Sequence, residues 1–269
     1  MRPSLDEGLI TSLIVQRSSE ELVEYAENSD VIVVGAGPAG LSAAYFLAKK
    51  GFKVLVLERR ISYGGGINGG GNLFHKIVYE ELEVEGFNSI KIAKELGLEL
   101  EESEAEGIYL IDASAFTATL AYNAIKAGAK VLLGWHVEDL IYRLVDGKVK
   151  VVGTVALWSP IEISGLHVDP IFFKSKAVID ATGHGAEVVK IASKKLPGVS
   201  LEVSRELGAW AEEAERLVVE KTGKVVDGLY VAGMAVASLY RLPRMGPAIS
   251  GMVLSGAKVA KLIEEEIKP

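Results

Sequence analysis

The chain has no cysteine and only four histidines among its 269 residues. The absence of cysteine excludes disulfide bonds, iron–sulfur clusters, thiolate metal sites and cysteine nucleophiles at once. No basic stripe follows the pattern of nucleic-acid phosphates, and the formal net charge of -7 opposes nonspecific binding to nucleic acid. The sequence shows neither a signal peptide nor an apolar run long enough to cross a bilayer. We therefore expect a soluble, cytoplasmic protein without membrane or nucleic-acid partners.

What the sequence does contain is enough apolar material for a large core, 49% of its residues, in alternating strand and helix patterns. No linker rich in proline, glycine or serine interrupts this alternation, so we expect one domain over residues 1–269. The predicted class is α/β: a Rossmann-like dinucleotide-binding fold with a parallel central sheet. A helical segment at about 4–28 precedes it, and a β-rich region is inserted at about 137–175.

The expected helices follow from apolar periodicity and end signals. Ser4 and Glu7 have the spacing of a capping box at the start of the N-terminal segment. Further helices are expected at 73–84, 89–97, 113–126 and 246–267.

The strongest local motif is GAGPAG, which supplies Gly35, Gly37 and Gly40 between a strand and a helix. In this pattern the first glycine permits a tight turn, the second lets a pyrophosphate approach the backbone, and the third lets the helix pack on the strand. Glu58 ends the next strand, where a carboxylate can meet ribose hydroxyls. The glycine-rich loop 64–71 follows, and its position favours backbone contact with the ligand over a flexible linker. The motif predicts an adenine dinucleotide but does not separate NAD from FAD.

A second candidate site involves His167 and Asp169 in SGLHVDP and His184 in ATGHG. Two imidazoles and a carboxylate are the ligand set of non-haem Fe(II) sites, although a His-x-Asp pair on a loop is also common as a solvated or capping pair. His184 follows a predicted strand, and open α/β sheets bind ligands at that end of their strands.

Arg244 is the candidate for binding an anion, because it directly precedes the expected start of the last helix at Gly246 and Pro247. A guanidinium beside a helix N-terminus can receive a carboxylate or a phosphate. An ordinary surface arginine is the alternative. We expect His136, next to Trp135, to be packed rather than catalytic.

Taken together, the segments resemble the adenosine diphosphate thiazole synthases of thiamine biosynthesis. The resemblance covers most of the chain and rests on the order and spacing of VIVVGAGPAGL, LERRISYGGGINGGGNLF, HVDP, ATGHGAE, GLYVAGMAV and RMGPAISGM. It implies a transferase that consumes NAD, glycine and sulfur and makes a thiazole carboxylate still attached to ADP. Family members use Fe(II) and assemble as homo-octamers whose sites are shared between subunits.

The resemblance also implies roles for single residues. Asp169 and His184 would ligate iron, and Arg244 would hold the glycine carboxylate. His167, Val168 and Asp169 would reach the site of a neighbouring subunit, and Met234 would lie against the nucleotide intermediate. The four catalytic candidates are thus His167, Asp169, His184 and Arg244. The remaining NAD contacts implied are Ala36, Glu58, Arg59, Gly66 and Val137.

The position of His167 decides the expected source of sulfur. In one branch of the family a cysteine stands there and gives up its own sulfur, so that each protein turns over once. This chain has no cysteine and resembles the branch that depends on free sulfide. Asn68, Asn72 and His75 depart from the residues usual in the family and leave the shape of the pocket open.

Three other functions are compatible with parts of the sequence. The main rival is an FAD-dependent oxidoreductase of the glutathione-reductase-like class, but Met234 stands where such enzymes usually carry an acid. A noncatalytic NAD sensor would bind NAD without consuming it. An isomerase of ribose 1,5-bisphosphate would need a sugar-phosphate site, for which we find no separate motif.

Overall fold

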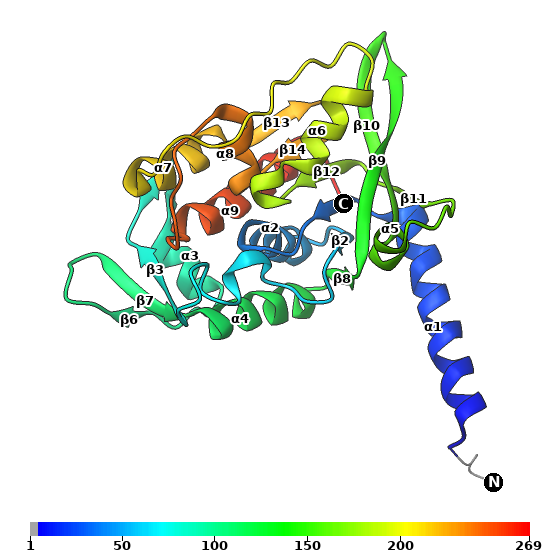
Figure 1. Cartoon of the computed structure of the whole chain (residues 1–269), viewed down its shortest axis with the longest axis horizontal. Helices are drawn as coiled ribbons and strands as arrows, with labels where there is room; N and C mark the ends of the chain where they lie inside the picture. Colours follow the sequence, from blue (N-terminus) through cyan, green and yellow to red (C-terminus); the bar gives the residue numbers. More distant parts are fainter. Residues whose placement is uncertain (1–4) are drawn as a thin grey trace.

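The computed structural model describes residues 5–269 and is built on a six-stranded central sheet (Figure 1). The strand order is β13-β14-β12-β1-β2-β8, and every neighbouring pair is parallel except β13 with β14 at one edge. This mainly parallel α/β sheet confirms the predicted fold class. Its strands are β1 (Val31–Val34), β2 (Val54–Glu58), β8 (Lys130–Leu133), β12 (Ala177–Asp180), β13 (Gly223–Val226) and β14 (Leu229–Val231).

The sheet is covered on both faces, which explains why its strands are apolar without alternation. Val31 and Val33 of β1 face a layer formed mainly by α2 (Pro38–Lys49), α4 (Ala113–Lys126) and α9 (Ser250–Glu266). The alternate residues, Ile32 and Val34, face a second, antiparallel sheet in the order β11-β10-β9. That sheet consists of β9 (Trp135–Val145), β10 (Lys148–Trp158) and β11 (Ile171–Lys174).

The other elements lie around these layers. A small antiparallel sheet has the order β3-β7-β6, and β4 pairs with β5. The elements are η1 (Gly65–Ile67), β3 (Lys76–Glu80), β4 (Glu83–Val84), β5 (Phe87–Asn88), α3 (Ser89–Glu95), β6 (Glu101–Glu102), β7 (Ile108–Asp112), α5 (Ser159–Ser164), η2 (Gly183–Gly185), α6 (Glu187–Lys195), α7 (Ala211–Lys221) and α8 (Met234–Tyr240).

Helix α1 (Glu7–Asn28) projects away from the rest of the chain, and its N-terminal end is farthest from the sheet (Figure 1). Asp6 caps it by accepting a hydrogen bond from the amide of Leu9 at 3.0 Å; Ser4, the cap expected from the sequence, lies outside the described residues. Leu13, Ile14 and Val23 are exposed on this helix. Among residues 5–269, no helix has both the length and the apolar character needed to cross a membrane.

Two of the expected helices need correction. The expected helix at 73–84 is wrong, because Lys76–Glu80 is a strand in which alternate residues, such as Ile77 and Tyr79, are buried. The last helix begins at Ser250 and not at Gly246. The preceding segment turns at Gly246 and Pro247 and pairs with β3 instead, because the carbonyl of Pro247 accepts a hydrogen bond from the amide of Val78 and the amide of Ile249 donates one to the carbonyl of Val78.

Candidate active site

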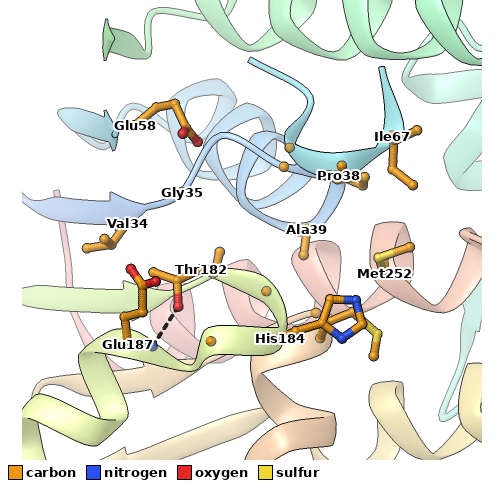
Figure 2. Close-up of a pocket in the computed structure, with 18 of the residues that line it drawn as sticks. Val34, Gly35, Pro38, Ala39, Glu58, Ile67, Thr182, His184, Glu187 and Met252 are labelled. Atoms are coloured by element: carbon orange, nitrogen blue, oxygen red, sulfur yellow. Dashed lines mark hydrogen bonds between the residues drawn. The ribbon is translucent and has the colours of Figure 1, made fainter. Parts of the chain in front are cut away.

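A cavity of about 630 Å³ lies at the C-terminal ends of β1, β2, β12 and β14. Figure 2 shows its two walls: Gly35, Pro38, Ala39 and Glu58 lie on one side, opposite the segment that carries Thr182, His184 and Glu187. This is the edge at which parallel α/β sheets bind ligands. Of the predicted site residues, the lining includes Gly35, Gly37, Glu58, Arg59, Gly66, Val137, His184, Met234 and Arg244.

The β1–α2 turn brings backbone very close to backbone. A Cβ on Gly40 would lie 2.0 Å from the carbonyl oxygen of Gly35, and one on Gly35 would lie 2.4 Å from that of Ala181. Gly37, the N-cap of α2, differs from both: within the described chain, no heavy atom lies within 4 Å of the position of its Cβ. The open side of the turn therefore presents the start of α2 to the cavity, where N–H groups and the helix dipole favour an anion.

Glu58 ends β2 and links two backbone segments at this wall. Its Oε2 accepts a hydrogen bond from the amide of Ala36 at 2.8 Å, and its Oε1 accepts one from the amide of Arg60 at 2.9 Å. The side chain is 6% exposed but lines the cavity. Ala36 itself is buried and contributes its amide to Glu58. Each carboxylate oxygen retains a lone pair for a further donor, such as a ribose hydroxyl.

The opposite wall is braced by Asp180 at the end of β12. Its carboxylate accepts hydrogen bonds from the amide and hydroxyl of Thr182 at 3.0 and 2.7 Å and from the amide of Val189 at 2.8 Å. The Thr182 hydroxyl also accepts a bond from the amide of Glu187 at 2.8 Å. Complete burial raises the pKa of Asp180, despite these hydrogen bonds. The network holds the loop that carries His184 against the sheet.

His184 lies in η2, with its side chain 58% exposed at the cavity (Figure 2). Its Nδ1 contacts Oε1 of Glu206, a side chain that is only 8% exposed. Burial alone would raise the pKa of Glu206, but the hydrogen bond with His184, supported by the charge of Arg244, lowers it. Glu206 therefore stays a carboxylate beside the imidazole.

Arg244 lines the same cavity but is not adjacent to a helix N-terminus, because α9 begins six residues later. This corrects the geometry expected from the sequence. The backbone of Arg244 forms hydrogen bonds with Gly208 and Trp210 instead. Arg244 and Glu206 are thus carried by two adjacent, paired segments. The charge of Arg244 and its position in the cavity still permit it to bind a carboxylate.

The loop 165–170 lies elsewhere. His167, Val168 and Asp169 are exposed, and they are not among the cavity-lining residues of the described chain. His184 and Arg244 therefore share one cavity, whereas Asp169 is not brought to it within the same chain. Over residues 5–269, a single chain gathers no group of three or more histidine, aspartate and glutamate side chains suited to a metal ion.

Several lining residues were not found from the sequence. Glu187 is one of them, and its Oε1 forms an ion pair with Nη1 of Arg59, a predicted site residue, at 2.6 Å although 128 residues separate the two. His136 was expected to be packed, and its side chain is indeed only 18% exposed, but it also lines the cavity. The alternation of polar and apolar residues along β9 could have indicated that position. Other lining residues that the sequence did not assign to the site include Arg60, Ile67, Trp135, Thr182, Met245, Pro247 and Met252.

The start of α9 forms the floor near Met252 and depends on a buried carboxyl group. Glu215 of α7 is fully buried and accepts a hydrogen bond from the amide of Gly251 at 2.5 Å. Burial, together with the nearby charge of Glu80, raises the pKa of Glu215 to about 8. The group is therefore largely a neutral carboxylic acid at neutral pH.

A glycine turn at a helix N-terminus, a carboxylate at the end of the second strand and a cavity at the carboxyl ends of the strands define a Rossmann-type fold of the dinucleotide-binding class. The Thi4 family profile matches residues 11–249, and the chain belongs to the Thi4 family.

Curated relatives cover nearly the whole chain. It is 53% identical to the thiamine thiazole synthase of Archaeoglobus fulgidus over 97% of this chain and 96% of the relative. It is 48% identical to that of Sulfolobus acidocaldarius over 98% and 96% of the two chains. The crystal structure of Thermovibrio ammonificans THI4 matches with a TM-score of 0.92 and 40% identity, over 98% and 99%. The chain is therefore an enzyme of this family.

More distant structures share the fold alone. The L-proline dehydrogenase from P. horikoshii aligns with a TM-score of 0.51 at 14% identity, over 90% of this chain.

Proposed function

We propose that this enzyme makes an ADP-linked thiazole carboxylate, the precursor of the thiazole of thiamine, from NAD, glycine and free sulfide with Fe(II). Membership of the Thi4 family and full-length similarity to thiamine thiazole synthases support the reaction class. The observation that carries the proposal is one cavity lined both by the dinucleotide-binding turn and by His184 and Arg244. A nucleotide held at the turn would extend its ribose toward these two side chains.

The residues of the cavity have separable tasks in this proposal. The start of α2 binds the pyrophosphate, and Glu58 binds the ribose hydroxyls. Arg244 orients glycine through its carboxylate, since a guanidinium pairs with it by charge and hydrogen bonds. Ala36, Arg59, Gly66, Val137 and Met234 complete the nucleotide contacts. The glycines of the loop around Gly66 bring backbone to the ligand.

The iron ligands in this proposal are His184 and Asp169. The donor chemistry fits, because an imidazole nitrogen and a carboxylate oxygen suit Fe(II), and the Nδ1 contact with Glu206 leaves Nε2 of His184 for a metal. Bound Fe(II) would supply Lewis-acid chemistry beside the substrates. Asp169 would act in the cavity of a neighbouring subunit, where His167 and Val168 would also contact the nucleotide.

This sharing of sites calls for an assembly, and we propose the homo-octamer that the family resemblance implies. Two features of the surface support contact between copies. Helix α1 exposes Leu13 and Ile14, and the region around loop 165–170 exposes Ile163 and Phe172. Apolar patches of this kind are typical of protein–protein interfaces.

Sulfur must come from solution in this reaction. A chain without cysteine has no thiol to sacrifice, and the thioethers of its four methionines carry no S–H group. By the family resemblance, His167 stands at the donor position of the self-sacrificing branch, and we propose that it binds an intermediate or moves a proton instead.

The test is an anaerobic incubation with NAD, glycine and Fe(II), with and without sulfide. We expect product only with sulfide, in molar excess over the protein, and an unchanged intact mass of the chain. Product without sulfide, accompanied by a loss of mass from the protein, would overturn the proposed sulfur source. A yellow purified protein that releases flavin, with no NAD consumed, would support the flavin-dependent alternative.

A further inference from the structure

We propose that Glu206 is a positioning residue that orients the ring of His184 and fixes its tautomer, so that Nε2 is presented as a metal ligand. The inference rests on the proposed role of His184 in binding iron. It adds a residue that neither the sequence motifs nor the lining of the cavity assigns.

The first observation is the contact itself. Oε1 of Glu206 meets Nδ1 of His184, so this ring nitrogen has an acceptor. The two side chains differ sharply in exposure, 8% for Glu206 against 58% for His184. A buried carboxylate thus supports one edge of an exposed ring and leaves the Nε2 edge accessible.

The second observation is that Glu206 is itself held in place. Ser238 of α8 is buried, donates a hydrogen bond to the carbonyl oxygen of His184 at 2.8 Å, and lies 3.5 Å from Oε1 of Glu206. Next to Glu206, the amide of Leu207 donates to the carbonyl of Leu242 at 3.0 Å. One hydroxyl therefore contacts both members of the pair, and backbone pairing locates the carboxylate.

The chemical consequence concerns the proton on the imidazole. A carboxylate is an acceptor only, so the neutral ring must donate from Nδ1 to satisfy it. The lone pair is then on Nε2, and a neutral ring in this form can ligate a metal through Nε2. Without the carboxylate, the ring can rotate and its proton can occupy either nitrogen.

The experiment uses the full-length protein without NAD or glycine, and Co(II) as a spectroscopic substitute for Fe(II). Three variants are compared with the wild type: Glu206→Leu removes the acceptor, Glu206→Gln keeps a neutral acceptor, and Glu202→Gln is the control. Glu202 is an exposed carboxylate on the same segment. Co(II) affinity is measured by absorption titration, and the His184→Ala variant supplies the background from other sites. Nitrogen-15 solid-state NMR of histidine-labelled, metal-free protein reads the tautomer.

We expect Nδ1–H at His184 in the wild type, in Glu202→Gln and in Glu206→Gln. Glu206→Leu should give a mixture of tautomers and a Co(II) affinity weaker by about 10- to 100-fold, the usual effect of losing the partner of a metal-ligating histidine. Glu206→Gln should lose less. A protonated Nε2 in the wild type, or equal Co(II) affinity in wild type and Glu206→Leu, overturns the inference.

The two proposals fail in different ways. If the wild type binds Co(II) no better than His184→Ala does, the proposed metal site is wrong. The tautomer is read without metal and still decides whether Glu206 orients the ring. If Glu206→Leu does not fold, the effect on Co(II) affinity is taken from the comparison of Glu206→Gln with the wild type. The NMR spectrum of the wild type alone still shows which ring nitrogen of His184 carries the proton.

Discussion

The two ends of the cavity are built differently. At the β1–α2 turn the cavity is lined mainly by backbone, which the buried carboxylate of Glu58 supports. At the other end it is lined by side chains carried on loops. The β1–α2 turn is packed so closely that a Cβ on Gly40 would overlap the carbonyl of Gly35. His184, in contrast, stands more than half exposed, and Asp169 lies on a loop outside the cavity. The first end offers one fixed shape to the proposed nucleotide. The second end can vary its chemistry, since its residues contribute little to the core.

The largest effect is expected from a substitution at the loop end, and it should change activity without changing stability. Asp169→Ala should abolish Fe(II)-dependent turnover, because it removes one of two proposed protein ligands of the metal. The free energy of unfolding should change by less than about 0.5 kcal/mol, as for other exposed positions. Product formation and urea unfolding measure the two quantities, with Ser164→Ala, exposed on the same segment, as the control. Wild-type turnover with normal iron content would remove Asp169 from the site.

At the β1–α2 turn, in contrast, a substitution by alanine should lower the stability of the fold itself. Gly40→Ala forces a methyl group to within 2.0 Å of a backbone oxygen that cannot move independently of the turn. We expect a loss of about 3 kcal/mol or more in the free energy of unfolding, at the upper end for overpacked cores, together with loss of NAD binding. Gly208→Ala is the matched control, since its Cβ meets no atom of the described chain within 4 Å. Equal stability of the two variants would contradict the close packing.

Arg244→Ala sharpens the comparison, because it should affect one substrate alone. Losing a charge-assisted hydrogen bond costs about 1.5–3 kcal/mol, which corresponds to a 10- to more than 100-fold weaker apparent affinity for glycine. The affinity for NAD should stay unchanged. Steady-state kinetics with each substrate varied in turn makes the measurement, and Arg205→Ala, an exposed arginine on the neighbouring segment, serves as control. An unaltered glycine dependence would make Arg244 an ordinary surface arginine.

The last effect concerns the pH dependence of stability, and we expect it beneath the cavity, at Glu215. Its pKa is raised to about 8 in the folded protein, so between the unfolded value of 4.5 and about 8 the folded state holds a proton that the unfolded state has released. The stability contributed by this protonation is complete below pH 4.5 and is lost as the pH rises through 8. The expected slope is at most about 1.4 kcal/mol per pH unit.

Glu215→Gln provides the test, because an amide can still accept the bond from Gly251 and does not titrate. The free energy of unfolding, measured from pH 5 to 9, should fall less steeply in this variant than in the wild type. Parallel curves for the two proteins would show that Glu215 titrates normally.

The sequence predicted the turn end of the cavity more completely than the loop end, for a physical reason. The contacts of the turn involve neighbouring residues and a fixed spacing, so GAGPAG and Glu58 are visible in one short segment. The helix 113–126 was similarly predictable from local apolar patterns. Contacts at the other end join residues far apart in the sequence.

Those distant contacts have no local signature. Glu206 meets His184 from 22 residues away, and Glu187 meets Arg59 from 128 residues away. The expected helix at 73–84 failed similarly, because the pairing of Lys76–Glu80 with β7 is decided by a strand that follows about thirty residues later. Asp180 could have been noticed as a carboxylate ending an apolar strand, but its role in holding the His184 loop depends on hydrogen bonds that only the fold brings together.

The position of Asp169 outside its own cavity has a consequence in genetic terms. If each catalytic centre takes His184 from one subunit and Asp169 from the next, a lesion in either residue inactivates every centre of a pure oligomer. In a cell carrying both alleles, however, some centres of a mixed oligomer receive two defective contributions and others receive none. An allele defective at His184 and an allele defective at Asp169 would then complement each other in trans. Such complementation is not expected when each subunit contains its whole catalytic centre.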